Sequence, residues 1–484
     1  MRGRTSPASS AARAAGAIEI NIATSAAARQ TPIGPMRRAV LDRRRAGVLL
    51  HLGSLVAPLG RGGRACIDWF ADAGFSVWQM LPLGPTGADN SPYWARSDFA
   101  GNPAFLDPQE LPECRGGEFD SFLAASQHWL GDYALYQALS RRQRGAPWWT
   151  WPQELRDRDS GAIERASAEL HEDLMRVKRE QFAFSVQWHR LREYAAHRGV
   201  RLFGDLPFYV APDSVETWAH RTQFQLERDG RPRTVAGVPP DYFTETGQLW
   251  GNPLYDWDVM SRDGFHLWRA RVHQQLERFD LLRLDHFRAL AAHWAVPASA
   301  PDARAGEWRH TPGKDLLRVL QDELGELPLV AEDLGIITAD VKALCRHFHL
   351  PGMRVLQFAF NGEGDNPHLP HMHERESVVY TGTHDNDTSL GWFSSLEGVA
   401  RRQVELLLRY TPGSMPDALI REILGSVGRL SILPVQDILS LGSEARLNTP
   451  GTAEGNWSWR LPPGVLTGAL CRRYAMLNRM YGRS

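Results

Sequence analysis

Short apolar runs of strand length alternate with helical patterns along most of this 484-residue chain, and this alternation constrains the fold more than any other feature. In chain order the apolar runs cover residues 47–51, 76–82, 200–205, 279–284, 327–331, 352–358, 378–384 and 431–437. Continuous apolar runs of this length are typical of strands that are buried on both faces. Strands separated by helices favour a parallel sheet, and about eight of them predict an α/β fold, the closed (β/α)8 TIM barrel.

Two stretches between these runs are too long for ordinary barrel loops. Residues from about 100 to 181 show helical patterning, for example over 129–142 and 162–181, which predicts an inserted helical subdomain. Residues from about 208 to 262 are rich in Pro, Gly and aromatic side chains, which predicts a long loop system over the mouth of the third strand. We therefore expect residues 36–484 to form a single catalytic barrel domain with these two insertions.

The segment 1–35 differs from the rest of the chain, because it is rich in Ala, Ser and Arg and has Glu19 as its only acidic residue. This composition resembles that of an organelle transit peptide. A disordered extension or a start codon assigned too early explains the composition at least as well, since Met36 offers a second start. We predict that this segment is disordered or not native and lies outside the fold.

Charge and composition exclude several classes of function. The net charge of −1 gives no electrostatic reason to bind nucleic acid or an anionic membrane, and no apolar run is long enough to span a bilayer. The four cysteines are scattered, so neither a zinc site nor a disulfide framework is indicated, and a reducing compartment is expected. The 17 tryptophans are expected to lie mostly in the core, but their flat faces also suit stacking on sugar rings.

Three acidic residues, Asp285, Glu332 and Asp385, each directly follow one of the apolar runs. The carboxyl ends of parallel strands are where barrel enzymes hold their catalytic groups. If the three converge, they supply the nucleophile, the general acid/base and the third carboxylate of a retaining glycosidase. The simpler interpretation is that such acids cap helices or pair with arginines, but three of them at equivalent strand ends favour convergence.

The first of these acids lies two residues after an arginine. Strand alternation places Arg283 and Asp285 on one face, and a neighbouring arginine keeps a carboxylate ionised, as a nucleophile must be. A structural ion pair inside the barrel fits the same two residues equally well. Glu332 needs a raised pKa to act as an acid, and burial or the nearby Asp285 would supply it. The adjacent Asp333 is expected to be structural.

The segment 380–388, with the sequence YTGTHDNDT, admits two interpretations. His384 and Asp385 could hold sugar hydroxyls and stabilise an oxocarbenium-like transition state. Alternatively, the segment could ligate a divalent metal together with His368, His371 and His373, although their spacing fits no helical or zinc-finger pattern. The first interpretation is favoured, so no metal is expected, and carboxylate chemistry requires no organic cofactor.

Longer motifs around these residues resemble those of one family. They cover residues 81–87 (LPLGPTG), 91–93 (SPY), 99–103 (FAGNP), 204–207 (GDLP), 236–243 (AGVPPDYF), 246–255 (TGQLWGNPLY) and 441–452 (LGSEARLNTPGT), in addition to the three acidic segments. The chain resembles the amylomaltases, also called 4-α-glucanotransferases or disproportionating enzymes, which form glycoside hydrolase family 77. The resemblance runs from about residue 47 to about residue 460.

The resemblance implies a transferase acting on malto-oligosaccharides and α-1,4-glucans by double displacement. Asp285 would be the nucleophile, Glu332 the general acid/base and Asp385 the stabiliser of the transition state. The residues for which it implies sugar contacts are Ser91, Tyr93, Asp205, Asp241, Gln248, Trp250, Arg283, His384 and Asn456. A cytoplasmic location is expected, and a plastid location only if the segment 1–35 is a transit peptide.

The chain departs from the family pattern near the expected barrel mouth. Leu52-Gly53 replaces Pro-Thr, Ala289 and Ala291 replace Gly and Glu, and Ala88-Asp89-Asn90 replaces Tyr-Gly-Asp. These departures bear on acceptor preference rather than on the central chemistry. Two other functions stay open at this stage: an α-amylase-type hydrolase that uses the same carboxylates, and a barrel that binds glucan without catalysis.

Overall fold

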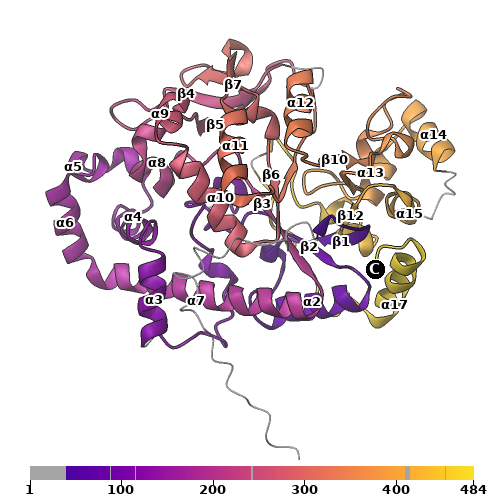
Figure 1. The fold of residues 1–484 in the computed structure, drawn as a ribbon, viewed down its shortest axis with the longest axis horizontal. Helices are drawn as coiled ribbons and strands as arrows, with labels where there is room; N and C mark the ends of the chain where they lie inside the picture. Colours follow the sequence, from indigo (N-terminus) through magenta and orange to yellow (C-terminus); the bar gives the residue numbers. More distant parts are fainter. Residues whose placement is uncertain (1–39, 88, 115, 241–243, 409–414, 453) are drawn as a thin grey trace, which may run out of the picture.

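The structure, a computed structural model, describes residues 40–87, 89–114, 116–240, 244–408, 415–452 and 454–484. Its centre is a sheet of eight parallel strands in the order β10-β11-β12-β1-β2-β3-β6-β9 (Figure 1). The strands are β1 (Arg45–Leu49), β2 (Val77–Gln79), β3 (Arg201–Leu206), β6 (Leu281–Leu284), β9 (Leu329–Ala331), β10 (Gly352–Val355), β11 (Ser377–Tyr380) and β12 (Leu430–Pro434). Each of the eight overlaps one of the apolar runs that predicted a strand.

The two edge strands of this sheet meet, because the Ala331 amide at the end of β9 donates a hydrogen bond of 2.8 Å to the Pro351 carbonyl just before β10. The sheet is therefore a nearly closed barrel, and the predicted (β/α)8 fold is confirmed. Apolar side chains fill its interior; they include Val77, Phe203, Leu281, Val330, Met353, Val378, Leu430 and Ile432. Gly47 faces this interior, where an added Cβ would lie 2.6 Å from Cδ1 of Ile432, so no larger residue fits.

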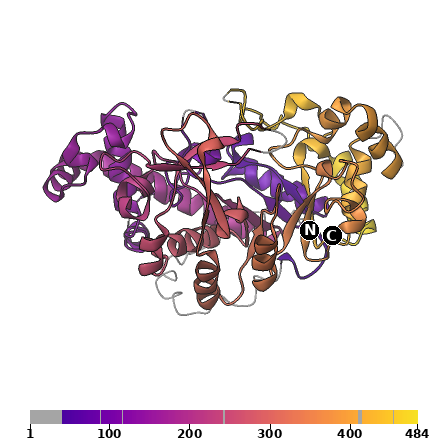
Figure 2. The same ribbon diagram turned by 90° about the horizontal axis from the view of Figure 1, so that it is seen from above.

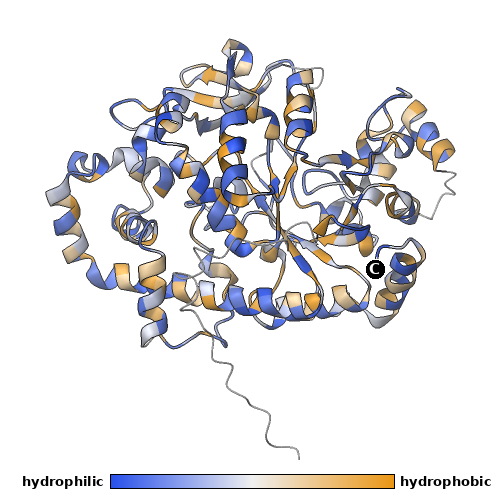
Figure 3. Cartoon of the chain, viewed as in Figure 1, coloured by the Kyte–Doolittle hydropathy of each residue, from blue (hydrophilic) through white to orange (hydrophobic). Residues whose placement is uncertain are grey.

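Helices cover the outside of the barrel, as the two perpendicular views show (Figures 1 and 2). They are amphipathic and carry hydrophobic and hydrophilic residues side by side (Figure 3). In α2 (Arg61–Asp72), for example, Cys66, Ile67, Trp69 and Phe70 form the buried side. The other helices after the barrel strands are α10 (His266–Arg278), α11 (Gly313–Leu324), α12 (Ala339–His347), α13 (Ser389–Ser395), α14 (Gly398–Leu407), α15 (Asp417–Gly425), α16 (Val435–Ile438) and α17 (Gly468–Met480).

Between β2 and β3 the chain forms a group of helices on one side of the barrel (Figure 1). They are α3 (Gly117–Ala125), α4 (Leu130–Arg142), α5 (Gln153–Arg156), α6 (Ser160–Glu169) and α7 (His171–His197). The 27 residues of α7 run back along the barrel and lead into β3. The helical pattern over 162–181 corresponds to two helices rather than one, because α6 ends at Glu169 and α7 begins at His171, with Leu170 between them.

A second sheet of four antiparallel strands lies beside the barrel in the order β5-β4-β7-β8. Its strands are β4 (Thr234–Val238), β5 (Gln248–Pro253), β7 (Ala292–Pro297) and β8 (Glu307–His310). The segment 208–262, predicted as a loop system, thus contains β4 and β5, as well as α8 (Val215–Ala219) and α9 (Trp257–Arg262). The sequence did not predict this sheet, because β4 pairs with β7, a strand that follows β6 in the chain.

Within the described ranges, no helix combines the length and the apolar character needed to cross a membrane. The segment 1–35, predicted to be disordered or not native, lies outside these ranges.

Candidate active site

Two charged side chains from neighbouring barrel strands form the centre of the site. Asp205 on β3 and Arg283 on β6 are register partners, so their side chains point to the same side of the sheet. Nη1 of Arg283 donates to both carboxylate oxygens of Asp205, at 2.9 and 2.8 Å, and both side chains are buried. Burial raises the pKa of Asp205, and the positive charge of Arg283 opposes this shift.

Asp285 lies one residue past the end of β6 and contacts the second terminal nitrogen of Arg283. Nη2 of Arg283 donates to Oδ1 of Asp285 at 2.7 Å, so the two residues share a face as strand alternation predicted. The amide of Asp285 donates to the carbonyl of Leu206 on β3 at 3.0 Å, which fixes the backbone at this point. The Asp285 side chain is 27% exposed, compared with 5% for Arg283. The carboxylate is therefore held by the guanidinium and still accessible to a ligand.

Glu332 follows β9, the strand next to β6, and backbone amides fix both of its carboxyl oxygens. The amide of His286 donates to Oε2 at 2.8 Å, and the amide of Leu334 donates to Oε1 at 2.9 Å. Burial raises the pKa of Glu332 to about 7; Arg283 opposes the shift, and the negative charge of Asp285 adds to it. A carboxyl group with this pKa can both donate and accept a proton near neutral pH.

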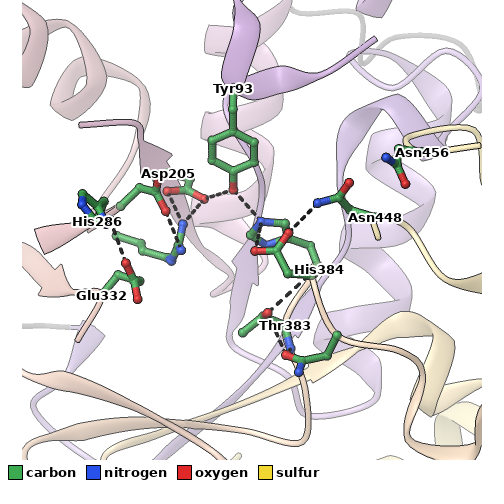
Figure 4. Close-up of polar contacts among 12 residues, drawn as sticks. Tyr93, Asp205, His286, Glu332, Thr383, His384, Asn448 and Asn456 are labelled. Carbon is green, nitrogen blue, oxygen red and sulfur yellow. Dashed lines mark hydrogen bonds and ion pairs between the residues drawn. The ribbon is translucent and has the colours of Figure 1, made fainter. Parts of the chain in front are cut away.

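His384 and Asp385 enter the site from the loop after β11, opposite Glu332. The hydroxyl of Tyr93 donates to Oδ2 of Asp205 at 2.7 Å and lies 2.8 Å from Nε2 of His384 (Figure 4). Because the single hydroxyl proton goes to Asp205, Nε2 of His384 is the donor in the second contact. The same nitrogen lies 3.3 Å from Oδ2 of Asp385. Tyr93 thus connects the Asp285 side of the site with the Asp385 side.

Two residues that the sequence did not single out also contact Asp385. Nδ2 of Asn448 donates to Oδ1 of Asp385 at 2.6 Å, and Nη2 of Arg446 donates to the Asp385 backbone carbonyl at 2.7 Å. Both residues lie in the segment after β12, within the motif 441–452. That motif contributed to the family resemblance, but no feature of its spacing indicated contact with Asp385, more than 60 positions away in the chain.

One aromatic side chain of the second sheet, Trp250, packs against His286, whose backbone amide contacts Glu332. The indole of Trp250 on β5 packs edge-on against the ring of His286, with ring centroids 4.7 Å apart. Its Nε1 donates to Oε1 of the exposed Gln248 at 3.0 Å. Burial lowers the pKa of His286 to about 4, so this imidazole is neutral near pH 7. The indole of Trp250 is therefore braced at the edge of the site and only half-buried.

The remaining predicted contacts are placed in different ways. Ser91 is buried directly before the short helix that carries Tyr93. Asn456 uses its side chain to hold the turn before it: its Oδ1 accepts from the Thr449 amide at 2.8 Å and its Nδ2 donates to the Thr452 carbonyl at 2.9 Å. In Figure 4 Asn456 lies beyond Asn448, away from Glu332. Asp241 lies outside the described residues.

The histidines of the alternative metal interpretation form internal hydrogen bonds. Nδ1 of His368 accepts from the Val355 amide at 3.1 Å, and the two nitrogens of His373 lie 2.9 Å from Oγ of Ser426 and 3.0 Å from the His368 carbonyl. Burial lowers the pKa of both imidazoles to about 4. Asp333, expected to be structural, pairs with Arg354 at 3.0 Å.

The positions near the barrel mouth that depart from the family pattern differ in how deeply they are buried. Leu52 and Ala289 are fully buried and cannot touch a ligand directly, while Ala291 is half-buried at the end of the turn after β6. A Cβ at Gly53 would lie 2.9 Å from the ring of His51, so the glycine allows this histidine its position. The influence of these positions on acceptor preference stays a prediction.

A parallel barrel with an arginine-held aspartate and a half-buried glutamic acid at adjacent strand ends is the arrangement of barrel enzymes that act on glycosidic bonds. The comparisons identify the particular family. A 4-α-glucanotransferase family model, that of glycoside hydrolase family 77, matches residues 50–115 and 111–467, and the chain belongs to this family.

Relatives from distant organisms agree with this assignment. The 4-α-glucanotransferase of Thermus thermophilus is 43% identical, with 87% of this chain and 95% of the relative covered. That of Synechocystis sp. is 40% identical, with coverage of 92% and 99%, and the chloroplastic/amyloplastic enzyme of Solanum tuberosum is 39% identical, with coverage of 87% and 83%. Among solved structures, the amylomaltase from Streptococcus agalactiae in complex with acarbose superposes with a TM-score of 0.87 at 29% identity, covering 91% of this chain and 100% of that one.

Proposed function

We propose that this chain transfers segments of α-1,4-glucan between malto-oligosaccharides by a retaining double displacement. The observation that carries the proposal is the pairing of an accessible Asp285, held by Arg283, with Glu332, whose pKa burial raises to about 7. A nucleophile and a proton donor at adjacent strand ends are what such a reaction requires.

In the first half of the proposed reaction Glu332 gives its proton to the glycosidic oxygen while a carboxylate oxygen of Asp285 attacks the anomeric carbon. The bond to the leaving sugar breaks, and a β-linked glycosyl-enzyme forms. We expect the two carboxyl groups to lie about 5–5.5 Å apart, as in other retaining enzymes. Asp205 keeps Arg283 in position, and Arg283 in turn aims the Asp285 carboxylate.

In the second half the Glu332 carboxylate removes the proton from the 4-hydroxyl of an incoming glucan. The oxygen attacks the anomeric carbon and releases Asp285, so two inversions give net retention. Transfer requires that the sugar hydroxyl outcompete water. The half-buried indole of Trp250, held against His286, supplies a flat apolar face suited to stacking an acceptor sugar and to excluding water.

The Asp385 side is proposed to stabilise the transition state. Asp385 is assigned to the hydroxyls and developing positive charge of the bound sugar, and His384 and Tyr93 assist it. Ser91, Gln248, Asn456 and Asp241 are assigned to outer sugar contacts by family resemblance.

A cytoplasmic location is part of the proposal, because the free thiols of Cys66, Cys114, Cys345 and Cys471 fit a reducing compartment.

Incubation with maltotriose alone tests the function. We expect glucose together with oligomers longer than maltotriose, and products no longer than the substrate would instead indicate a hydrolase. A Glu332→Gln variant should lose turnover by roughly 10³-fold or more and still bind maltotriose, because only the proton transfer is removed. Unchanged turnover would reject Glu332 as the general acid/base.

A further inference from the structure

The loop 381–389, which carries His384 and Asp385, is held at both ends by one buried carboxylate. Asp437, on α16 after β12, accepts from Oγ1 of Thr381 at 2.5 Å and from the amide and hydroxyl of Ser389 at 2.7 and 2.6 Å. These bonds lie four residues to either side of Asp385. They fix the backbone of the loop and leave the orientation of the Asp385 side chain to other contacts.

The Asp385 carboxylate needs such contacts, because its side chain is 42% exposed, whereas that of His384 is 5% exposed. The amide of Asn448 donates to Oδ1 at 2.6 Å, and Nε2 of His384 lies 3.3 Å from Oδ2. Oδ1 therefore has a hydrogen-bond donor of its own, whereas Oδ2 has only a longer contact with a nitrogen whose proton goes to Tyr93. The shorter contact, the one to Asn448, comes from outside the loop (Figure 4).

Arg446 fixes the geometry of the contact between Asn448 and Asp385, because it donates hydrogen bonds to the backbones of both residues. Its Nη2 donates to the Asp385 carbonyl at 2.7 Å, and its Nε donates to the Asn448 carbonyl at 2.8 Å. One rigid guanidinium thus sets the distance between the Asp385 backbone and the Asn448 backbone. Nδ2 of an asparagine can only donate, which suits an ionised carboxylate, and it brings no charge that would compete with a cationic transition state.

We propose that Asn448 is a positioning residue for the transfer reaction: its amide locks Oδ1 of Asp385, so that Oδ2 faces the sugar. The inference rests on the proposed role of Asp385 in stabilising the transition state. Asn448 does not need to touch the substrate, and its effect passes through Asp385. Its loss therefore lowers kcat more than it raises KM.

Replacement by alanine and by aspartate gives different signatures. Asn448→Ala removes the donor, and turnover should fall roughly 10–100-fold at all pH values. Asn448→Asp places a second carboxylate against Asp385, so the pair repels unless it shares a proton. The turnover of this variant, divided by that of the wild type, should rise at least several-fold as the pH falls from about 8 to about 5. His384, Arg446 and Thr383 also contact Asp385, and the Tyr93 hydroxyl contacts His384; these groups are the same in every variant.

An exposed pair elsewhere in the chain provides a matched control. Nδ2 of Asn361 donates to Oε2 of Glu363 at 2.8 Å on the surface. Asn361→Asp creates the same contact between two exposed carboxylates in the loop after β10, and its turnover ratio should stay near one at every pH. Thermal unfolding of all variants identifies any loss of folded protein.

A double-mutant cycle shows whether Asn448 acts through Asp385. In an Asp385→Ala background, Asn448→Ala should cost less than about 3-fold, because the carboxylate that it orients is gone. The proposal is overturned by a flat pH ratio for Asn448→Asp, by an alanine variant within 3-fold of wild type, or by additive costs in the cycle. A wild type that fails to lengthen maltotriose would instead overturn the proposed function itself.

Discussion

Two buried arginines, each paired with aspartate, serve opposite purposes in this molecule. Arg271 on α10 is completely buried; its Nε donates to Asp98 at 2.6 Å, and its other nitrogens donate to the Tyr255 hydroxyl and to the carbonyls of Pro207 and Phe208. We call Arg271, Asp98 and Tyr255 the closed cluster. Arg283, Asp205 and Asp285 form the open cluster, in which the Asp285 side chain stays 27% exposed.

The difference lies in where the arginine donors go. In the closed cluster the donors of Arg271 go to Asp98, to the Tyr255 hydroxyl and to two backbone carbonyls just after β3, so the buried charge fixes the path of the chain. In the open cluster those of Arg283 end on two carboxylates, one buried and one accessible. A buried arginine is thus structural when all the acceptors of its hydrogen bonds are buried. It becomes chemically useful when one of those acceptors remains accessible to a ligand.

The largest difference between the clusters should come from neutralising one aspartate in each. Asp285→Asn removes the proposed nucleophile, so turnover should fall roughly 10⁴-fold or more, with little change in unfolding temperature. Asp98→Asn should reduce stability by about 3–5 kcal/mol, because Arg271 stays buried without its counter-charge, while the folded fraction keeps its turnover. Maltotriose transfer assays and thermal unfolding measure both. If Asp285→Asn and Asp98→Asn lost turnover equally per folded molecule, the distinction between the open and the closed cluster would be wrong.

Replacing the arginine of each cluster with lysine is the second test. Lysine cannot contact Asp205 and Asp285 at once, so Arg283→Lys should lower kcat roughly 10²–10³-fold. Arg271→Lys loses the contacts to the Pro207 and Phe208 carbonyls and should mainly lower the midpoint of urea unfolding. If Arg271→Lys lowered kcat as much as Arg283→Lys, the closed cluster would have a role in the chemistry.

Two glutamates, one beside each cluster, should give the protein similar pH dependences of stability. Burial raises the pKa of Glu332 to about 7, and it raises that of Glu216, which lies against Asp98 and Ser97, to about 8. The unfolded chain releases these protons near the ordinary value of 4.5, so stability falls as the pH rises from there toward the folded pKa. Replacing either by glutamine should therefore stabilise the protein at pH 8 relative to pH 4.5, by about 1–3 kcal/mol.

Chemical denaturation across this pH range measures the effect, and maltotriose transfer then separates the two glutamates. Glu332→Gln should abolish transfer, whereas Glu216→Gln should leave it intact. A Glu332→Gln variant with the pH dependence of the wild type would contradict the shift assigned to Glu332.

The smallest effect on catalysis is expected from the tryptophans beside the clusters. Trp250→Ala should raise KM for maltotriose roughly 10-fold through lost stacking, with kcat within a few-fold of wild type. Trp268 is buried under the guanidinium of Arg271, whose central carbon lies 4.4 Å from the ring centroid. Trp268→Ala should instead cost about 3–5 kcal/mol of stability and leave KM unchanged. Steady-state kinetics on soluble variants distinguish these outcomes.

The sequence predicted those parts of the site that the barrel strands position. Each barrel strand overlaps a run of mostly apolar residues, and the alternation within 279–285 places Arg283 beside Asp285 before any tertiary contact is known. The second sheet and the contact of Asn448 with Asp385 depend on pairings between distant segments. Local patterns carry no signal for such pairings, so the structure was needed to find them. The sequence did not indicate Glu216 either, because the shift of its pKa depends on burial that only the fold creates.

The hydroxyl of Tyr93 has a consequence for how deep a sugar can enter the barrel. β3 and β11 are four places apart in the ring of eight strands, so Asp205 and the loop of His384 belong to opposite walls. One phenol oxygen reaches both, at 2.7 and 2.8 Å. The proposed reaction therefore predicts that a glucose ring lies on the mouth side of this hydroxyl, with Asp285 and Glu332, and not among the apolar side chains of the barrel interior.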